Sequence, residues 1–250
     1  LERPRPSPEK PPEYNPRSYD SDELITAASG SGFFVSKEGH LVTNNHVINH
    51  CSEVKFKHAG EIMNATVVAR DRVNDLALLK TGLKDPTTLP ISSSNPALLQ
   101  DIYAAGFPFG SSVSAAVKVT KGIVSSLSGV ADNFSNVQID AALQPGNSGG
   151  PILDEYGNAV AVAVAKLDLE QIIKAYGVVP ENTNFGIKAT VVRNLLEANS
   201  IRISKPNTTK LSGSELGQRI IQGTVHLSCL MTMAQIEQVR DQKVLFTEFD

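Results

Sequence analysis

The sequence predicts an all-β protein, mainly because short apolar or alternating runs follow one another from Leu24 onward, separated by Gly, Pro, Asn and Ser. No long amphipathic helices lie between these runs, which favours barrels or sandwiches over alternating β and α units. With 250 residues, of which 41% are apolar, the chain is long enough to bury a core. The expected strands are 32–35, 40–43, 62–69, 76–80, 102–105, 117–120, 137–139, 152–153 and 159–165.

Charge and hydropathy exclude two classes of partner. Lys plus Arg total 23 and Asp plus Glu total 26, so the formal net charge is −3 and there is no basic excess for nucleic-acid binding. The longest apolar run, 159–165, is far shorter than the roughly 20 residues that cross a bilayer. We expect no nucleic acid as partner and no membrane span in this chain.

The chain divides into three parts. Residues 1–23 are rich in proline and charge and read as a linker. The strand-like runs and the chemistry fall within 24–199. Residues 200–250 are expected to form a small α/β extension that packs on the strands. Helices are expected at 169–176, 190–198 and 232–240, where apolar residues recur at helical spacing.

Two cysteines, Cys51 and Cys229, are too few for a disulfide scaffold and lack the paired spacing of a structural zinc site. They form either one bridge between the first half of the chain and its tail, or two separate buried thiols. Both alternatives stay open on the sequence alone.

The strongest local signal is the run Gln144-Pro145-Gly146-Asn147-Ser148-Gly149-Gly150-Pro151. Glycines beside a serine allow backbone torsions that other residues avoid, so substrate can approach the turn closely. In such a turn the amides of Gly146 and Ser148 can converge on a developing oxyanion. The alternative is a Gly-rich hairpin loop with an exposed serine.

A serine nucleophile needs a base, and the base needs an orienting acid. His46 lies near the end of the β-like run 41–48, and Asp75 directly precedes the apolar run 76–79, where it would be partly desolvated. Asp71 is a rival acid, but its neighbours Arg70 and Arg72 suit an exposed ion pair. The predicted catalytic residues are therefore His46, Asp75 and Ser148, in that order along the chain.

Two competing motifs are set aside. Residues 146–150 also satisfy the G-x-S-x-G elbow of α/β-hydrolases, which needs its acid and histidine after the serine, whereas only His226 follows. His46, His50 and Cys51 have a spacing that can seat zinc, but no further ligand lies near them in the sequence. We expect no metal and no cofactor.

The order and flanks of the three residues resemble the chymotrypsin-like serine proteases, and within them the Deg/HtrA branch. The motifs lie at 30–35, 41–48, 74–80, 106–110, 122–125, 139–151 and 184–187. The resemblance covers about 29–199 and implies two six-stranded antiparallel β-barrels, with His46 and Asp75 on the first and Ser148 on the second. It also implies an oxyanion hole lined by the amides of Gly146, Asn147 and Ser148.

The resemblance places the specificity pocket just before the serine turn, at Ala142 and Leu143. An uncharged alanine there implies a preference for small or medium aliphatic residues before the scissile bond. The segment Val164, Ala165 and Lys166 is the expected edge that pairs with substrate backbone. The implied activity is that of an endopeptidase acting on unfolded or extended polypeptides.

The tail departs from the Deg/HtrA pattern because residues 200–250 are too few for a peptide-binding PDZ domain. The expected helix at 169–176 is an insertion beside the pocket. We expect a periplasmic or secreted location, and a homo-oligomer stays open. Two alternative functions remain: a peptide-binding or chaperone-like module with a latent, mispositioned triad, and a non-peptide acyl hydrolase.

Overall fold

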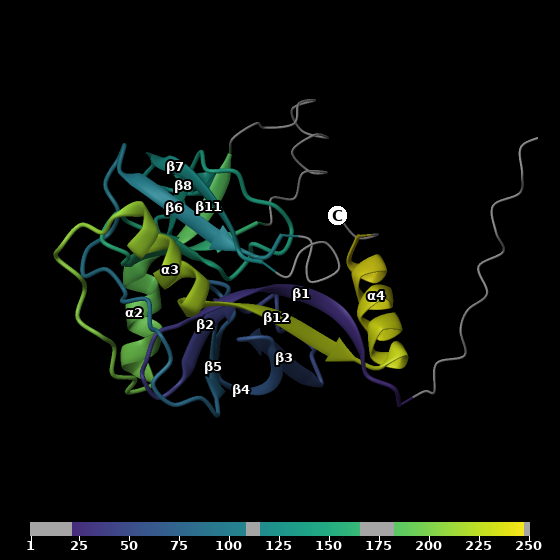
Figure 1. Ribbon diagram of the computed structural model, residues 1–250. Helices are drawn as coiled ribbons and strands as arrows, with labels where there is room; N and C mark the ends of the chain where they lie inside the picture. The colour runs from purple at the N-terminus through teal and green to yellow at the C-terminus, as the bar shows by residue number, and fades with distance from the viewer. Residues whose placement is uncertain (1–21, 109–115, 166–182, 248–250) are drawn as a thin grey trace, which may run out of the picture.

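The computed structural model describes residues 22–108, 116–165 and 183–247, with side chains to residue 241, and contains two β-barrels (Figure 1). The first barrel is closed in the order β1-β12-β3-β4-β5-β2. Its strands are β1 (Ile25–Phe34), β2 (His40–Asn44), β3 (Glu53–His58), β4 (Glu61–Asp71), β5 (Leu76–Thr81) and β12 (Thr224–Met231).

The second barrel is closed in the order β10-β11-β8-β7-β6-β9, and every strand pair in both barrels is antiparallel. Two six-stranded antiparallel barrels, the fold that the resemblance implies, are thereby confirmed. The strands are β6 (Asp101–Gly106), β7 (Lys118–Ser126), β8 (Asn136–Ile139), β9 (Pro151–Leu153), β10 (Ala159–Val164) and β11 (Asn184–Lys188), and a short 3-10 turn, η1 (Val130–Asp132), lies between β7 and β8.

Strands at the junction of the barrels are buried on both faces, which explains their nearly continuous apolar sequence. In β5, Ala77 and Leu79 pack inside the first barrel, while Leu76 and Leu78 belong to a core shared with the second barrel. Successive strand residues point to opposite faces, so both faces must be apolar when both are covered. This shared core fixes one barrel against the other.

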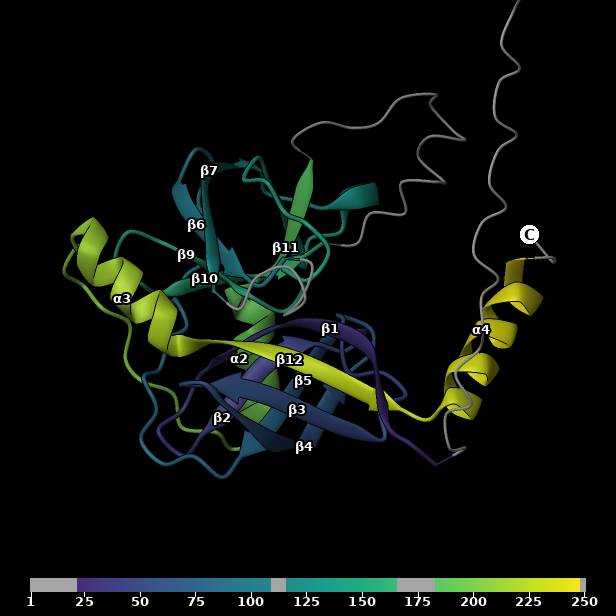
Figure 2. The same cartoon turned by 45° about the vertical axis from the view of Figure 1, so that its right-hand side comes forward.

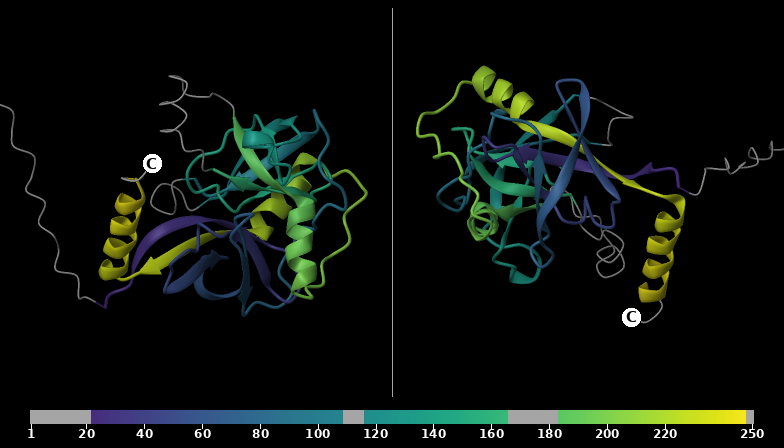
Figure 3. Two further views of the ribbon diagram at one scale, coloured as in Figure 1. Left: turned by 180° about the vertical axis from the view of Figure 1, so that it is seen from behind. Right: turned by 90° about the horizontal axis from the view of Figure 1, so that it is seen from below.

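Three helices complete the described part of the chain: α2 (Ala189–Ala198), α3 (Gly213–Gly223) and α4 (Met233–Thr247). The expected helices at 190–198 and 232–240 match α2 and α4, and α4 leads away from the barrels beyond the end of β12 (Figure 2, Figure 3). Helix α3 was not predicted, although Ser212 and Glu215 form a capping box that signals its start. The expected helix at 169–176 lies outside the described residues.

Strand β12 departs from the expected organisation, in which 200–250 is a separate extension that packs on the barrels. It lies between β1 and β3, with Leu227 opposite both Gly30 and Phe56. The side chains of Val225 and Leu227 pack in the interior of the first barrel. The boundary drawn at residue 199 therefore separates strands of one barrel, because pairing between distant strands leaves no local mark in the sequence.

A disulfide joins Cys51 to Cys229 across a sequence separation of 178 residues. Cys229 lies on β12, and Cys51 lies between the turn that carries His46 and strand β3. The structure thus contains the bridge, one of the two alternatives that the sequence left open. It ties the last strand of the barrel to a segment close to the candidate site.

Candidate functional site

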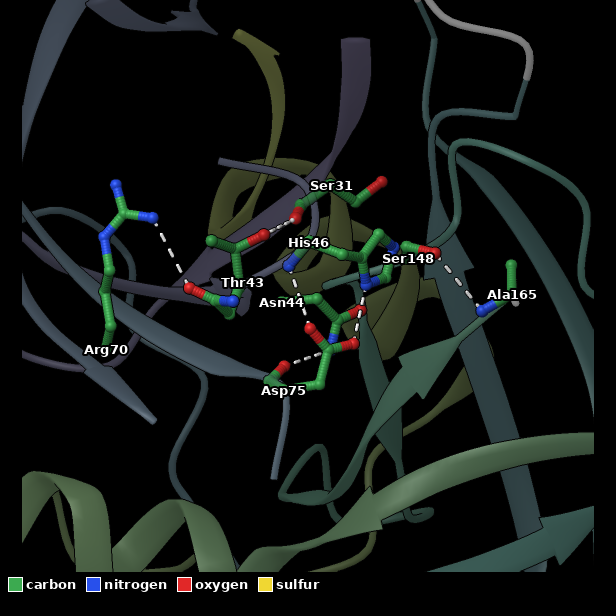
Figure 4. A network of polar contacts seen from close by, with 9 residues as sticks. Ser31, Thr43, Asn44, His46, Arg70, Asp75, Ser148 and Ala165 are labelled. Carbon is green, nitrogen blue, oxygen red and sulfur yellow. Dashed lines mark hydrogen bonds and ion pairs between the residues drawn. The ribbon is translucent and has the colours of Figure 1, made fainter. Parts of the chain in front are cut away.

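The first half of the site is a histidine–aspartate pair that two neighbouring strands bring together. Strands β2 and β5 pair with Asn44 opposite Leu76, so the turn after β2 and the residue before β5 meet at one edge of the barrel. His46 Nδ1 lies 2.6 Å from Asp75 Oδ2, and the backbone amide of His46 donates to Asp75 Oδ1 at 2.8 Å (Figure 4). One carboxylate therefore holds both the ring and the main chain of the histidine.

The backbone of Asp75 is itself held in place. Its φ of 55° lies in the left-handed region, which costs a non-glycine residue energy unless the surroundings fix it. The carbonyl oxygen of Asp75 accepts from Asn45 N at 3.1 Å and from the side chain of the fully buried Asn44 at 3.0 Å. These bonds orient the carboxylate toward the imidazole.

The pairing decides which ring nitrogen is free for chemistry. A carboxylate only accepts hydrogen bonds, so Nδ1 of His46 carries the donated proton and Nε2 is left to exchange one. The side chains of His46 and Asp75 are 27% and 32% exposed, so the pair is partly shielded yet reachable from solvent. This is the arrangement of a base with an orienting acid.

The second half of the site is the turn before Ser148. Gln144, Pro145, Gly146 and Asn147 form it, with Gly146 at φ 100° and Asn147 N donating to Gln144 O at 2.9 Å. Proline at the second position and a positive φ at the third are the marks of a type II turn. The Pro-Gly pair in the sequence is thus what the turn requires.

This turn corrects one detail of the expected oxyanion hole. The amide of Asn147 closes the turn and is not available to an oxyanion. The amides of Gly146 and Ser148 take part in none of the backbone bonds that the described residues form outside regular elements. Of the three amides predicted to line an oxyanion hole, those of Gly146 and Ser148 therefore remain as candidates.

The first barrel anchors the turn through Ser31 of β1, a residue that sequence reasoning missed. Its hydroxyl donates to Gly146 O at 2.7 Å, and its amide donates to Ser148 O at 2.8 Å. The same hydroxyl accepts from Phe107 N at 2.9 Å. The Gly-Ser-Gly run at 30–32 was the signal for this close contact between the barrels.

Gly149 is required by packing as well as by torsion. Its φ is 83°, and a Cβ there would lie 2.2 Å from Thr43 Oγ1 and 2.3 Å from Ser31 O. Thr43 in turn donates to Ser31 O at 2.7 Å (Figure 4). The turn thus lies directly on strands β1 and β2, which brings Ser148 beside the His46 turn.

The side chain of Ser148 is nearly buried, at 5% exposure, and its Oγ accepts from Ala165 N at 3.2 Å (Figure 4). Within the described residues, no hydrogen bond joins this hydroxyl to the imidazole of His46. Bonds between catalytic groups are often loose without substrate and tighten in the complex. The structure thus places His46, Asp75 and Ser148 close together, while the serine oxygen accepts its hydrogen bond from the backbone amide of Ala165 (Figure 4).

The acid–base pair has a further support that the sequence did not reveal. Arg70 donates to Asn45 Oδ1 at 3.4 Å and to Ile48 O at 3.3 Å, so it bridges the turn on both sides of His46. Burial, and then the nearby Arg72, lower the pKa of Arg70.

Asp71, the rival for the acid, does not contact His46 in any hydrogen bond of the described residues. Its carboxylate accepts from the amide and the side chain of Asn74 at 3.0 and 2.7 Å.

The predicted substrate-binding residues differ in their exposure to solvent and in their position in the second barrel. Ala142 is exposed, and its carbonyl accepts from Thr120 Oγ1 at 2.8 Å. Leu143, at 9% exposure, packs in the core of the second barrel. Val164 ends β10 opposite Phe185, and Ala165 follows it beside Ser148. Lys166 lies outside the described residues.

No group of three His, Cys, Asp or Glu side chains suited to a metal ion occurs in the described parts of the chain. In the same parts, no helix is both long and apolar enough to cross a membrane.

Two β-barrels that contribute a His–Asp pair and a Gly-flanked serine to one junction define the class of chymotrypsin-like serine peptidases. In agreement, residues 30–162 match the family model of the trypsin-like peptidase domain. The chain belongs to this family, and it is homologous to serine proteases of the Deg/HtrA branch.

Three relatives illustrate the homology. The chain is 36% identical over 205 residues to the uncharacterized protein y4bJ of Sinorhizobium fredii, which covers 81% of this chain and 32% of the relative. It is 28% identical to serine endoprotease DegS of Haemophilus influenzae, over 71% of this chain and 52% of that protein. It is 35% identical to a probable periplasmic serine endoprotease DegP-like of Pseudomonas savastanoi, over 65% of this chain and 33% of the relative. The chain thus spans about a third to a half of the length of these relatives.

Proposed function

We propose that the protein is a serine endopeptidase that hydrolyses peptide bonds in unfolded or extended polypeptides through His46, Asp75 and Ser148. The observation that carries the proposal is the pair of hydrogen bonds that His46 donates to the carboxylate of Asp75, at 2.6 and 2.8 Å, beside the glycine turn of Ser148. Membership of the trypsin-like peptidase family supports the same reaction class.

The proposed reaction begins when Ser148 Oγ attacks the carbonyl carbon of the scissile bond and its proton passes to Nε2 of His46. Asp75 stabilises the imidazolium, and the amides of Gly146 and Ser148 bind the oxyanion. His46 then gives the proton to the leaving amine, which breaks the peptide bond and leaves an acyl-serine. Water attacks this ester by the same route in reverse, which releases the acid and restores Ser148.

The specificity part of the proposal rests on Ala142, which is exposed and uncharged just ahead of the serine turn. We expect cleavage after small or medium aliphatic residues, with substrate backbone running along 164–166. A peptide library read by mass spectrometry tests this. Faster cleavage after Arg than after Val would refute the assigned preference while leaving the triad untouched.

A second candidate function is favoured by the bond from Ala165 N to Ser148 Oγ together with the lack, within the described residues, of a hydrogen bond between Ser148 Oγ and the imidazole of His46. In that case the chain binds extended peptides and the triad is latent. A fluorophosphonate probe separates the two. If the probe labels the parent protein and Ser148→Ala abolishes the labelling, the peptidase is supported. If the parent protein binds peptides but is not labelled, the latent module is supported.

We also propose a periplasmic or secreted location. The Cys51–Cys229 disulfide supports it, because such bonds persist in oxidising compartments, and one homologue is itself described as periplasmic. Alkylation of cysteines in freshly lysed cells, with and without reductant, is the test. Two free thiols before reduction would contradict the assignment.

A further inference from the structure

A cavity of about 270 Å³ is lined by residues of both barrels and of the junction between α3 and β12. Figure 2 shows α3 running directly into β12. Three parts of the chain line it. The β3–β4 hairpin contributes Lys57, the second barrel contributes Phe107 and Val117, and the α3–β12 junction contributes Ile221, Thr224 and His226. His46, Asp75 and Ser148 do not line it.

Two buried polar atoms in the lining have no hydrogen-bond partner among the residues that the structure describes. Thr224 and His226 are 3% and 6% exposed, and neither Thr224 Oγ1 nor His226 Nε2 has a hydrogen-bond partner in the described parts of the chain. A buried polar atom without a partner costs about 1–3 kcal/mol, so native proteins usually satisfy it. A ligand with polar oxygens would provide the missing partners.

Strand geometry directs both side chains toward the second barrel. Thr224 and His226 are two residues apart on β12 and share a face, while Val225 and Leu227 point into the first barrel. His226 lies opposite Ser31, whose hydroxyl bonds to Gly146 and Phe107 of the second barrel. The shared face therefore looks into the junction where the cavity lies.

The charge of the lining favours an anion. Lys57 lies directly opposite His226 on β3, and the described lining contains no Asp or Glu. Burial, and then the charge of Lys57, lower the pKa of His226, so its imidazole is neutral near pH 7. A neutral imidazole, a hydroxyl and an ammonium group together suit a carboxylate head.

His58, Ala59 and Gly60 of the β3–β4 hairpin also line the cavity, and the remaining side chains of the described lining are mainly apolar. The ring of Phe107 packs edge-on against the His226 ring, with centroids 5.8 Å apart, and Val117 lies beside it in the lining. Ile221, which is 59% exposed, lies at the outer rim. The volume is near the lower end of ligand pockets, roughly 300–1,000 Å³, so a small ligand is the better fit.

We propose that this cavity, the His226 pocket, binds a small amphipathic carboxylate. Its head would lie between Lys57, Thr224 and His226, and its aliphatic body would lie against Phe107 and Val117. The Ser31 hydroxyl accepts from the amide of Phe107 and donates to the carbonyl oxygen of Gly146, so one hydroxyl connects the wall of the pocket with the Ser148 turn.

The test uses octanoate, below its micelle concentration, as the probe for the intact, disulfide-bonded chain. Titration calorimetry or ligand-observed NMR measures binding. The comparators are 1-octanol, which lacks the carboxylate head, and acetate, which lacks the aliphatic body. We expect saturable binding of octanoate and at least about tenfold weaker binding of either comparator.

Substitutions locate the site. Lys57→Met should weaken octanoate binding about tenfold or more, and the isosteric Thr224→Val should weaken it several-fold. Lys55→Met, on the same strand but outside the lining, is the matched control and should bind like the parent protein. Urea unfolding verifies each fold, and Lys57→Met alone suffices if Thr224→Val does not fold.

Three results would overturn the proposal: no saturable binding of octanoate, equal affinity for octanol, or equal effects of Lys57→Met and Lys55→Met. Binding is measured directly, so the outcome does not depend on peptidase activity. A failure of the His226 pocket and a failure of the proposed function are therefore distinguishable.

Discussion

Removing the Cys51–Cys229 bridge should destabilise the protein strongly. The bond closes a loop of 178 residues, for which the chain-entropy relation predicts a contribution of about 5 kcal/mol at 25 °C. Measured losses of native bridges range over about 2–5 kcal/mol, and whole domains have only about 5–15 kcal/mol. Since the bridge joins β12 to the segment after His46, its loss should also loosen the strand that closes the first barrel.

The assay is urea unfolding with and without reductant. Reduction of the parent protein should lower the urea midpoint by about 0.7–2.5 M, which is a loss of about 2–5 kcal/mol divided by an unfolding slope of about 2–3 kcal/mol per M. The double variant Cys51→Ala, Cys229→Ala should unfold near the reduced parent and show no response to reductant. Comparing these two proteins separates the cross-link from any cavity at Cys229, which is 1% exposed, because the reduced parent keeps both sulfur atoms.

An unchanged midpoint after complete reduction, verified by thiol titration, would refute the reasoning. It would mean that the pairing of β12 with β1 and β3 alone holds the barrel closed. Limited proteolysis adds a local readout. Cleavage at 224–231 in the reduced protein, before global unfolding, would show that β12 is the part released.

Three further predictions concern single residues. Asp75→Asn should lower kcat about 10⁴-fold without unfolding the protein, and Asp71→Asn, on the same turn, should cost far less in a peptidase assay. Gly149→Ala should reduce peptidase activity about 100-fold or more, because the added Cβ would lie 2.2 Å from the Thr43 hydroxyl oxygen and displace the serine turn. Gly217→Ala is the control: its Cβ meets open space, and it should stabilise helix α3 by about 0.5–1 kcal/mol in thermal unfolding. Burial lowers the pKa of His226 below its ordinary 6.5, so below about pH 6.5 the unfolded chain binds a proton that the native state does not, and the free energy of unfolding should fall as the pH drops. His226→Gln should flatten this pH dependence. A dependence as steep as the parent's would show that His226 is not its source.

Much of the fold could be predicted because its signals are local. The run 76–79 predicts a strand by its apolar residues, and Pro145-Gly146 predicts a tight turn by torsion. The capping box of Ser212 and Glu215 is an equally local signal for the start of helix α3, although apolar spacing did not predict this helix. Strand β3, Glu53–His58, is harder to see, since charged residues alternate with few apolar ones.

The reactive groups could be identified from the amino-acid sequence alone: a histidine, an acid and a Gly-flanked serine, in an order shared with the chymotrypsin-like proteases. Residue type and short spacing carry that information, because reactivity and turn geometry depend on immediate neighbours. Four features needed the three-dimensional structure: β12 closes the first barrel, Cys51 bonds to Cys229, the Asn147 amide is hydrogen-bonded within its turn, and His226 lines a cavity. These features depend on which distant strands lie side by side, and that choice is made by the packing of the whole core.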